Sequence, residues 1–304
     1  MDTTTLIETD RKKVREKYEK SSKDVERDIS TIKEWLKTQQ HLPEVPADEV
    51  IEFYLTNCKY SIEKTKKVLD MNYTARELLP EIFEDSDPNL PNYQETLPKI
   101  TTIIPLPKLT DQLYRIIIIK CGENVEIFDP HKIVTHAINV LEVSTFEDLF
   151  SALVVIFDNK DMKMAHLRKA TPIFFKKVLF LLEKSKSLRI AEIHILNYKH
   201  DLVKILLTIA KTVIKKKFMD RIILHENFEN LYNYIPKSIL PSDYGGTERS
   251  LDDLQDLWKM KFREYSDRFD KIKTMKVNES LRSQPLENSE TLGYYGHFKK
   301  LDVD

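Results

Sequence analysis

The stretch that decides the fold reads Ile-Leu-Pro-Ser-Asp-Tyr-Gly-Gly over residues 239–246 and is followed by Ser-Leu-Asp-Asp-Leu over residues 250–254. The chain of 304 residues contains only five glycines, so two of them side by side are unusual. Adjacent glycines after a tyrosine predict a backbone turn in which no Cβ atom would fit.

Upstream of this turn, segments typical of strands alternate with segments typical of helices. The strand-like segments are rich in β-branched residues, and the helix-like segments carry apolar residues at helical spacing. We expect strands at residues 100–105, 115–120, 153–157, 192–196 and 222–225, and helices at residues 129–143, 171–184 and 200–216. Alternation of this kind predicts an α/β domain with a mixed, mostly parallel sheet flanked by helices.

The first part of the chain is typical of helices only. Apolar spacing predicts helices within residues 5–40, at 48–58 and at 61–79, where Ser61 is the expected N-cap. Residues 81–94 are acidic and contain prolines, so we expect a connecting loop there. We therefore predict an N-terminal all-helical domain at residues 1–95, an α/β domain at 96–273 and an extended C-terminal tail at 274–304.

Composition excludes several classes of protein. Lys and Arg total 48 against 49 Asp and Glu, so no overall charge attracts nucleic acid. The two cysteines, Cys58 and Cys121, lie far apart, which argues against a disulfide framework and fits a reducing compartment. The first residues lack the basic and apolar regions of a signal peptide. The longest apolar run, residues 152–157, is far shorter than the ~20 residues that cross a bilayer. We therefore expect a cytoplasmic protein that contacts membranes only at their surface.

Motifs for catalysis and metal binding are absent from the sequence. It contains no phosphate-binding P-loop, no dinucleotide-binding turn and no nucleophile elbow. No cysteine pair or closely spaced histidine pair suggests zinc. The eight histidines are scattered, and we expect each to be a core or surface residue; they are His41, His131, His136, His166, His194, His200, His225 and His297. The sequence therefore predicts a protein that is not an enzyme and that uses no cofactor.

Residues 239–246 resemble the closing segment of CRAL-TRIO lipid-binding domains, which reads Ile-Leu-Pro-x-x-Tyr-Gly-Gly and precedes an acidic and apolar helix. Residues 53–60 resemble the helical motif near the start of such proteins, although Thr56 and Cys58 stand where the family often has arginine. Asp161 departs from the family pattern too, because glycine is common there. Within the family the chain is similar to the tocopherol- and retinaldehyde-binding branch and to its insect members. The resemblance implies a hydrophobic pocket, enclosed by the sheet and its helices, that holds a small hydrophobic molecule without altering it.

The helix expected at residues 200–216 has an unusually wide apolar face. Its apolar residues fill an arc of roughly 200°, whereas a surface helix needs a stripe of only about 100°. Lys204, Lys211 and Lys215 gather on the opposite side. One interpretation is a helix packed between two neighbours. The resemblance implies the other, a mobile gate that covers a ligand when closed and meets lipid when open.

The resemblance also implies which side chains line the pocket. Positions that align with pocket positions of the family are Leu153, Phe157, Val178, Leu181, Leu182 and Leu188. The gate helix adds Val203, Leu206 and Leu207. Each of these residues, taken alone, fits an ordinary place in the core better than a contact with a ligand. Apolar walls discriminate ligands mainly by shape, so tocopherol, retinoid, carotenoid and phospholipid all remain open.

Positive charge is concentrated near the gate helix. Between Lys199 and Arg221 there are seven Lys or Arg residues and two Asp residues. Basic residues beside a membrane are each worth about 1 kcal/mol toward anionic lipid, but lysines at a helix C-terminus also offset its dipole. The resemblance implies a basic cleft for phosphoinositide head groups, formed here by Arg189, Lys217 and Arg221. Ala191 stands at the fourth position of that cleft, where the family has a basic residue.

These features allow three functions. The first is a monomeric carrier that takes a hydrophobic molecule from one membrane, shields it and releases it at a membrane that contains phosphoinositide. The second is a lipid-sensing adaptor module, in which bound lipid alters a protein partner that docks on the charged N-terminal helices. The third is an enzyme similar to α/β-hydrolases, which would require a nucleophile at a strand-to-helix turn, and the sequence contains none.

Overall fold

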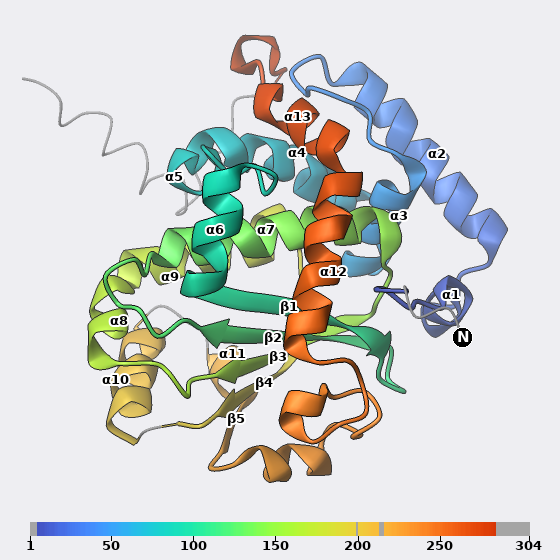
Figure 1. The fold of residues 1–304 in the computed structure, drawn as a ribbon. Coiled ribbons are helices and arrows are strands. Elements are labelled where there is room, and N and C mark those ends of the chain that lie inside the picture. The colour runs from blue at the N-terminus through green and yellow to red at the C-terminus, as the bar shows by residue number, and fades with distance from the viewer. Residues whose placement is uncertain (1–4, 199, 213–215, 284–304) are drawn as a thin grey trace, which may run out of the picture.

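The computed structural model describes residues 5–198, 200–212 and 216–283. From residue 11 to residue 100 the chain forms helices, and a mixed five-stranded sheet flanked by helices follows (Figure 1). This arrangement confirms the predicted fold class. The helices before the sheet are α1 (Arg11–Lys17), α2 (Ser22–Thr38), α3 (Asp48–Asn57), α4 (Ile62–Leu78), α5 (Pro80–Phe83) and α6 (Pro91–Ile100).

The α/β part contains strands β1 to β5 and the helices that connect and follow them. The strands are β1 (Thr101–Leu109), β2 (Tyr114–Cys121), β3 (Ala152–Asp158), β4 (Ile190–Leu196) and β5 (Ile222–His225). The helices are α7 (Pro130–Glu147), α8 (Met164–Lys169), α9 (Pro172–Phe180), the π-helical turn η1 (Leu181–Ser185), α10 (His200–Lys211), α11 (Lys216–Met219), α12 (Leu251–Glu264) and α13 (Ser266–Thr274). Three short 3-10 turns complete the described elements, η2 (Phe228–Asn233), η3 (Ser242–Tyr244) and η4 (Glu279–Leu281).

The N-terminal helices begin where their capping residues predict. Ser21 and Asp24 form a capping box at the start of α2, and the Ser61 hydroxyl accepts a hydrogen bond from a backbone N–H in the first turn of α4. Ile32 and Leu36 of α2 are buried and belong to a core that α2, α3 and α4 share. Local capping and apolar spacing together explain why this part of the chain is helical.

The prediction of a connecting loop at residues 81–94 is wrong. Pro80 and Pro91 each occupy the first turn of a helix, α5 and α6, and only the residues between these helices form a loop. Proline suits the first helical position because its missing N–H has no intrahelical partner there and its φ is already helical. These prolines therefore begin helices, where the sequence pattern suggested that they interrupt them.

The strands of the sheet follow their order in the chain, β1-β2-β3-β4-β5. β1 runs antiparallel to β2, and β2 to β5 run parallel to one another. Parallel strands are joined almost always by right-handed crossovers, so connections that all advance in one direction place their helices on one face. This face receives α9 and α10, and α12, orange in Figure 1, crosses the other face. Helix α7 lies beside the edge strand β1, and its residues Val140 and Val143 share a core with α12.

The paired glycines form the tight turn that the sequence predicts. Gly245 is left-handed, with φ +68°, and a Cβ atom on Gly246 would lie 1.9 Å from the carbonyl oxygen of Leu240. Tyr244, just before the glycines, donates a hydrogen bond of 2.9 Å from its hydroxyl to a carboxylate oxygen of Asp158 at the end of β3. This hydrogen bond joins the turn to the end of the central strand, β3, shortly before α12 begins.

A buried ion pair joins several elements beside β2. The Arg115 guanidinium donates two hydrogen bonds of 2.7 Å to the Asp148 carboxylate, and both side chains are 1% exposed. It also donates to the carbonyls of Leu106 and Pro107 at 2.7 and 2.6 Å and to that of Glu8 at 2.9 Å. Arg115 therefore connects the end of α7, the edge strand β1 and the start of the chain.

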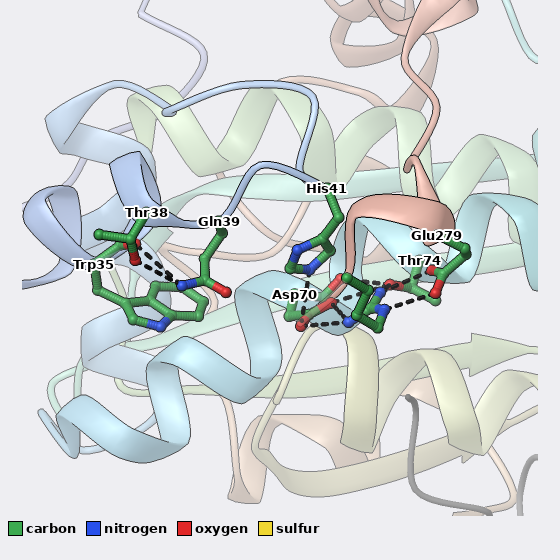
Figure 2. Close-up of polar contacts among 8 residues, drawn as sticks. Trp35, Thr38, Gln39, His41, Asp70, Thr74 and Glu279 are labelled. Carbon is green, nitrogen blue, oxygen red and sulfur yellow. Dashed lines mark hydrogen bonds and ion pairs between the residues drawn. The ribbon is translucent and has the colours of Figure 1, made fainter. Parts of the chain in front are cut away.

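The segment after α13 folds back onto the N-terminal helices. Arg282 donates to both carboxylate oxygens of Asp70 on α4, at 2.8 and 2.7 Å, and the Asn278 N–H donates to the His41 carbonyl at 2.9 Å. Figure 2 shows His41, Asp70 and Thr74 gathered beside this segment. The predicted extended tail therefore starts with an anchored stretch that includes η4. Residues 284–304 lie outside the described part of the chain.

Candidate functional site

The two faces of the sheet are covered to different extents. On the face that α12 crosses, Ile116 of β2 and Ile156 of β3 are fully buried. On the opposite face Ile117, Ile119 and Phe157 are only half-buried, and the last two are paired in register. Central parallel strands are normally covered on both faces. The structure therefore leaves accessible apolar surface at the middle of the sheet, on the side of the crossover helices.

The predicted pocket residues are distributed between this face and the helices above it. Leu153, Leu181 and Val203 are buried, and the others are half-buried; these are Phe157, Val178, Leu182, Leu188, Leu206 and Leu207. Four of the nine pack in one apolar cluster with the open face of β2, namely Leu153, Phe157, Leu182 and Leu188. Leu181 belongs to a separate cluster with α4 and α5. The structure thus brings together the β3 residues, one residue within the π-helical turn and one residue after it.

Helix α10 presents a partly covered apolar stripe. Val203, Leu206, Leu207 and Ala210 follow the helical spacing of one face, and the first and last of them are buried whereas the middle two are half-buried. Outside this stripe Ile205 is 38% exposed. The helix contacts α8 and α9. Residues 213–215, the end of the predicted gate helix, lie outside the described residues.

A cleft of about 750 Å³ opens at the amino ends of the four parallel strands. Arg189, directly before β4, and Arg221, directly before β5, both line it, and so does Ala191. The structure therefore brings together two of the three predicted head-group residues. The third, Lys217, belongs to α11, and its side chain lies outside the described part of the structure.

The arginines of the cleft are held by neighbouring groups. Arg189 donates from Nη1 to the Tyr18 hydroxyl at 3.1 Å and to the Ser151 carbonyl at 3.3 Å. Arg221 donates to the Ile190 carbonyl, and its guanidinium lies over the Phe218 ring, 5.3 Å from the centroid. None of these contacts is with a carboxylate, so none of them neutralises the charge of either guanidinium group. Both arginines can therefore still attract an anion.

Sequence reasoning missed other charged residues of the cleft. Lys59, Lys64 and Lys184 line it, as do Glu183 and Glu192. The only signal for the first two is their position around Ser61, which caps α4 and so predicts a helix start. Their proximity to Arg189 arises from tertiary packing of the helical part against the sheet, which local sequence patterns do not report.

The cleft and the open face of the sheet share structural elements. The π-helical turn and the residues after it contribute Leu182 to the apolar side and Lys184 to the cleft, whereas Leu188 belongs to both. Single π-helical turns frequently occur at functional sites. On the other side, α10 is connected through α11 to Arg221.

A buried lysine fixes the segment after the π-helical turn. The Lys186 ammonium donates to the Asn72 side-chain oxygen at 2.5 Å and to the Tyr54 hydroxyl at 3.3 Å. Burial lowers the pKa of Lys186 to about 8, although the Glu142 carboxylate opposes this shift. Burial likewise raises the pKa of the nearby Cys58 thiol, so this cysteine is not activated as a nucleophile. These groups hold the helical part against the cleft.

Two histidines that are far apart in the sequence meet on the adjacent strands β4 and β5. His194 Nδ1 and His225 Nε2 are 2.8 Å apart, and burial is the main cause that lowers the pKa of both rings. His194 Nε2 also lies 3.0 Å from a carboxylate oxygen of Glu192. Within the described ranges, no three His, Cys, Asp or Glu side chains gather as a metal ion would require. None of the helices described is both long and apolar enough to span a bilayer.

Residues 101–246, which hold the whole sheet and the glycine turn, match the model of the CRAL/TRIO domain family. The chain is a CRAL-TRIO protein. In this CRAL-TRIO protein the helical part has its own match, because residues 21–93 match the model described as "Pinta-like, UBA domain". Asp161, the departure noted in the family pattern, has no left-handed φ and lies 3.8 Å from the Lys120 ammonium. The turn after β3 therefore does not require glycine.

Comparison with individual proteins supports the same family. Proteins named "Alpha-tocopherol transfer protein-like" from Homo sapiens and Mus musculus are 30% identical over 111 residues, which are 36% of this chain. The CRAL-TRIO protein thus matches about a third (32%) of the length of these relatives. The crystal structure of Sfh5 superposes with a TM-score of 0.50 and 11% identity, over 88% of this chain and 100% of that chain. This similarity is one of fold.

Proposed function

We propose that this protein binds a small hydrophobic molecule, such as a tocopherol, retinoid or carotenoid, and transfers it between membranes. The observation that carries the proposal is the half-buried apolar face of the central strands, with Ile117, Ile119 and Phe157 beneath the crossover helices. The name of its relatives, which refers to α-tocopherol transfer, supports the ligand class. Burial of such a ligand gains about 25 cal/mol per Å² of apolar surface, which is the physical basis of carriage.

The gate of this pocket is helix α10. Its apolar stripe is incompletely covered by protein, so a bound ligand would complete the burial of Leu206 and Leu207. Ile205 and Ile173, on the neighbouring helices α10 and α9, are 38% and 49% exposed. Large contiguous apolar patches on a protein surface mark sites that bind protein or membrane. We assign Ile205 and Ile173 to contact with the bilayer when the gate opens, which makes the protein a peripheral, monomeric carrier in the cytoplasm.

The docking site is the basic cleft, which would bind a phosphoinositide head group through Arg189, Lys217 and Arg221. The connection of α10 to Arg221 through α11 supports a link between docking and gate opening. The alternative is a lipid-sensing adaptor, in which the ligand stays bound and the helical part contacts a protein partner. The separate family match of residues 21–93 is the observation that favours this alternative.

Native mass spectrometry of the purified protein, followed by organic extraction, tests the pocket. We expect one retained isoprenoid or retinoid for each chain, because the accessible apolar face is stabilised only when it is covered. An empty protein that also takes up no hydrophobic fluorescent probe would contradict the pocket. A retained lipid that never exchanges with vesicles would contradict transfer and favour the adaptor.

Removal of the two described cleft arginines tests docking. We expect the variant Arg189→Gln/Arg221→Gln to bind anionic vesicles about thirtyfold more weakly, because each base near a membrane contributes about 1 kcal/mol. Its affinity for the hydrophobic ligand in solution should remain unchanged. The matched control is Lys132→Gln/Lys160→Gln, which removes two exposed lysines at the opposite, carboxyl edge of the parallel strands. Equal transfer rates for both variants in a vesicle assay would show that the cleft is not the docking site.

A further inference from the structure

Strand β5 forms the last part of the accessible apolar face of the sheet. Ile222 pairs in register with Ile193 of β4, and Leu224 pairs with Ile195. Residues directly opposite each other on neighbouring strands point to the same face. Since Ile193 packs in one cluster with the half-buried Phe157, Ile222 and Leu224 also point toward the side of the predicted pocket. Among the strands described, β5 has four residues and lies at the edge, so it detaches more easily than the central strands.

On the other face, β4 and β5 are joined by two buried side chains, His194 and His225, which we call the histidine pair. His194 Nδ1 lies 2.8 Å from His225 Nε2, and the ring planes are 24° apart. His194 Nε2 lies 3.0 Å from a carboxylate oxygen of Glu192. Because an ionised carboxylate only accepts hydrogen bonds, this nitrogen carries the proton of the neutral ring, and Nδ1 accepts the N–H of His225. A single proton therefore lies between the two rings.

The surroundings of the histidine pair do little to stabilise added positive charge. Within the described ranges, Glu192 is the one carboxylate that contacts the pair, and it is partly exposed. The Tyr234 ring lies against both imidazoles, with centroids 5.2 and 5.4 Å apart. The register partners of the two histidines are apolar; they are Ile156, Ile223 and Leu196. The next carboxylates along the chain are exposed; they are Glu226 and Glu229. Burial therefore lowers the pKa of both rings, and Glu192 only partly opposes this for His194.

Protonation of both rings is incompatible with their contact. When one ring gains a proton, one N–H still lies between the two nitrogens and the hydrogen bond persists. When both rings are protonated, both nitrogens carry a proton, no acceptor remains, and two like charges repel at close range. The rings must then separate. Because they lie buried on adjacent strands, their separation displaces β5 from β4.

We propose that the histidine pair is an acid-sensitive switch, which holds β5 in the sheet at neutral pH and releases it when both rings are protonated. Loss of β5 opens the edge of the apolar face, so the protein gives up its hydrophobic ligand in acid. This inference rests on the proposed carrier function and adds to it the condition under which the ligand leaves.

The pKa shifts fix the direction and the steepness of the switch. The pKa of both rings is lowered in the closed form, whereas a histidine in contact with water has a pKa of about 6.5. The closed form is therefore fully stable above about pH 6.5 and loses stability as the pH falls below it. Each extra proton that the open form binds raises its population about tenfold per pH unit, so two protons raise it about a hundredfold.

Amide hydrogen exchange of the full chain without ligand tests the switch itself. Rates for residues 222–225 are divided by the intrinsic rate at each pH and compared with those of β3. We expect the opening constant of β5 to rise about a hundredfold per pH unit below about pH 6.5, while β3 stays protected. In His194→Gln/His225→Gln, which has no titrating ring at this place, the opening constant should not depend on pH.

Two further variants accompany this measurement. His225→Gln keeps one ring and should show a rise of at most about tenfold per pH unit, so it decides the question if the double variant does not fold. A hundredfold rise in His225→Gln would contradict the proposal. The matched control His131→Gln replaces a half-buried histidine of α7 and should open like the natural protein.

Transfer of retinol from the loaded chain to neutral phosphatidylcholine vesicles tests the release of ligand. Retinol has no group that titrates in this range, so a dependence on acid arises from the protein. We expect transfer to accelerate about tenfold or more from about pH 7 to about pH 5 in the natural protein and in His131→Gln, and to stay constant in the double variant.

The outcomes separate this inference from the carrier function. If β5 keeps its protection in acid, or if the double variant loses protection equally, the switch is wrong. If β5 opens in acid but retinol stays bound, the link between the switch and release is wrong. A chain that takes up no retinol at neutral pH contradicts the pocket for this ligand, and the exchange of β5 then decides the switch by itself.

Discussion

Replacement of Gly246 by alanine is expected to destabilise the protein by about 3 kcal/mol or more, and to reduce the yield of folded protein. A Cβ atom at this position would lie 1.9 Å from the Leu240 carbonyl oxygen and 2.4 Å from its carbon. Both are backbone atoms, so no side-chain rotation relieves the overlap, and the turn that positions Tyr244 against Asp158 must shift. The midpoint of urea denaturation, followed by circular dichroism, measures the effect.

The neighbouring positions supply controls for this turn. Thr247→Ala removes atoms from an exposed side chain whose backbone N–H keeps its hydrogen bond to the Lys237 carbonyl, so it should melt like the natural protein. Gly245→Asn should cost less than Gly246→Ala, since asparagine tolerates the left-handed φ of +68° and the nearest atom there is the Tyr232 hydroxyl oxygen of a side chain. If Gly246→Ala is as stable as the natural protein, the turn accommodates a Cβ atom at this position and the Leu240 backbone does not exclude it.

Substitution of Arg115 by methionine is expected to cost about 3–5 kcal/mol, because it leaves a buried carboxylate without its partner. Asp148 is 1% exposed and receives two hydrogen bonds from Arg115. The carbonyls of Leu106, Pro107 and Glu8 lose a donor at the same time. Urea denaturation of the single variant measures the loss.

The double variant Arg115→Met/Asp148→Leu shows whether the unpaired charge is the cause. A buried ion pair that is replaced as a whole by apolar side chains is often tolerated. We therefore expect the double variant to be more stable than Arg115→Met alone. If the two are equally unstable, the cost arises from the lost carbonyl contacts and not from Asp148.

Local patterns in the sequence were sufficient for most elements of the fold. The cap at Ser61 and the glycine turn at residues 245–246 depend on neighbours within a few residues, and the structure has them where the sequence predicts. The prolines at residues 80 and 91 misled the prediction because proline favours both a loop and the first turn of a helix. Only tertiary packing distinguishes the two, since α5 and α6 are stabilised by contact with α7.

The candidate site was less accessible to sequence reasoning. The resemblance to the CRAL-TRIO family predicted Arg189 and Arg221 as head-group residues, and both line the cleft. Lys59 and Lys64 line the same cleft although they lie 125 to 162 residues earlier in the chain, and no periodicity in the sequence indicates that these residues meet. The pairing of His194 with His225 escaped notice for the same reason, because adjacent parallel strands bring together residues from separate segments.

The unequal coverage of the two faces of the sheet has a consequence for how such proteins diversify. Along β2, Ile116 and Ile118 point to the filled side, and Ile117 and Ile119 to the open side. A smaller side chain at either residue of the first pair leaves a cavity in a close-packed core. A substitution in the second pair mainly changes the shape of the space available to a ligand. Selection on stability and selection on ligand choice therefore act on alternate residues of one strand, and new specificities can evolve without loss of the fold.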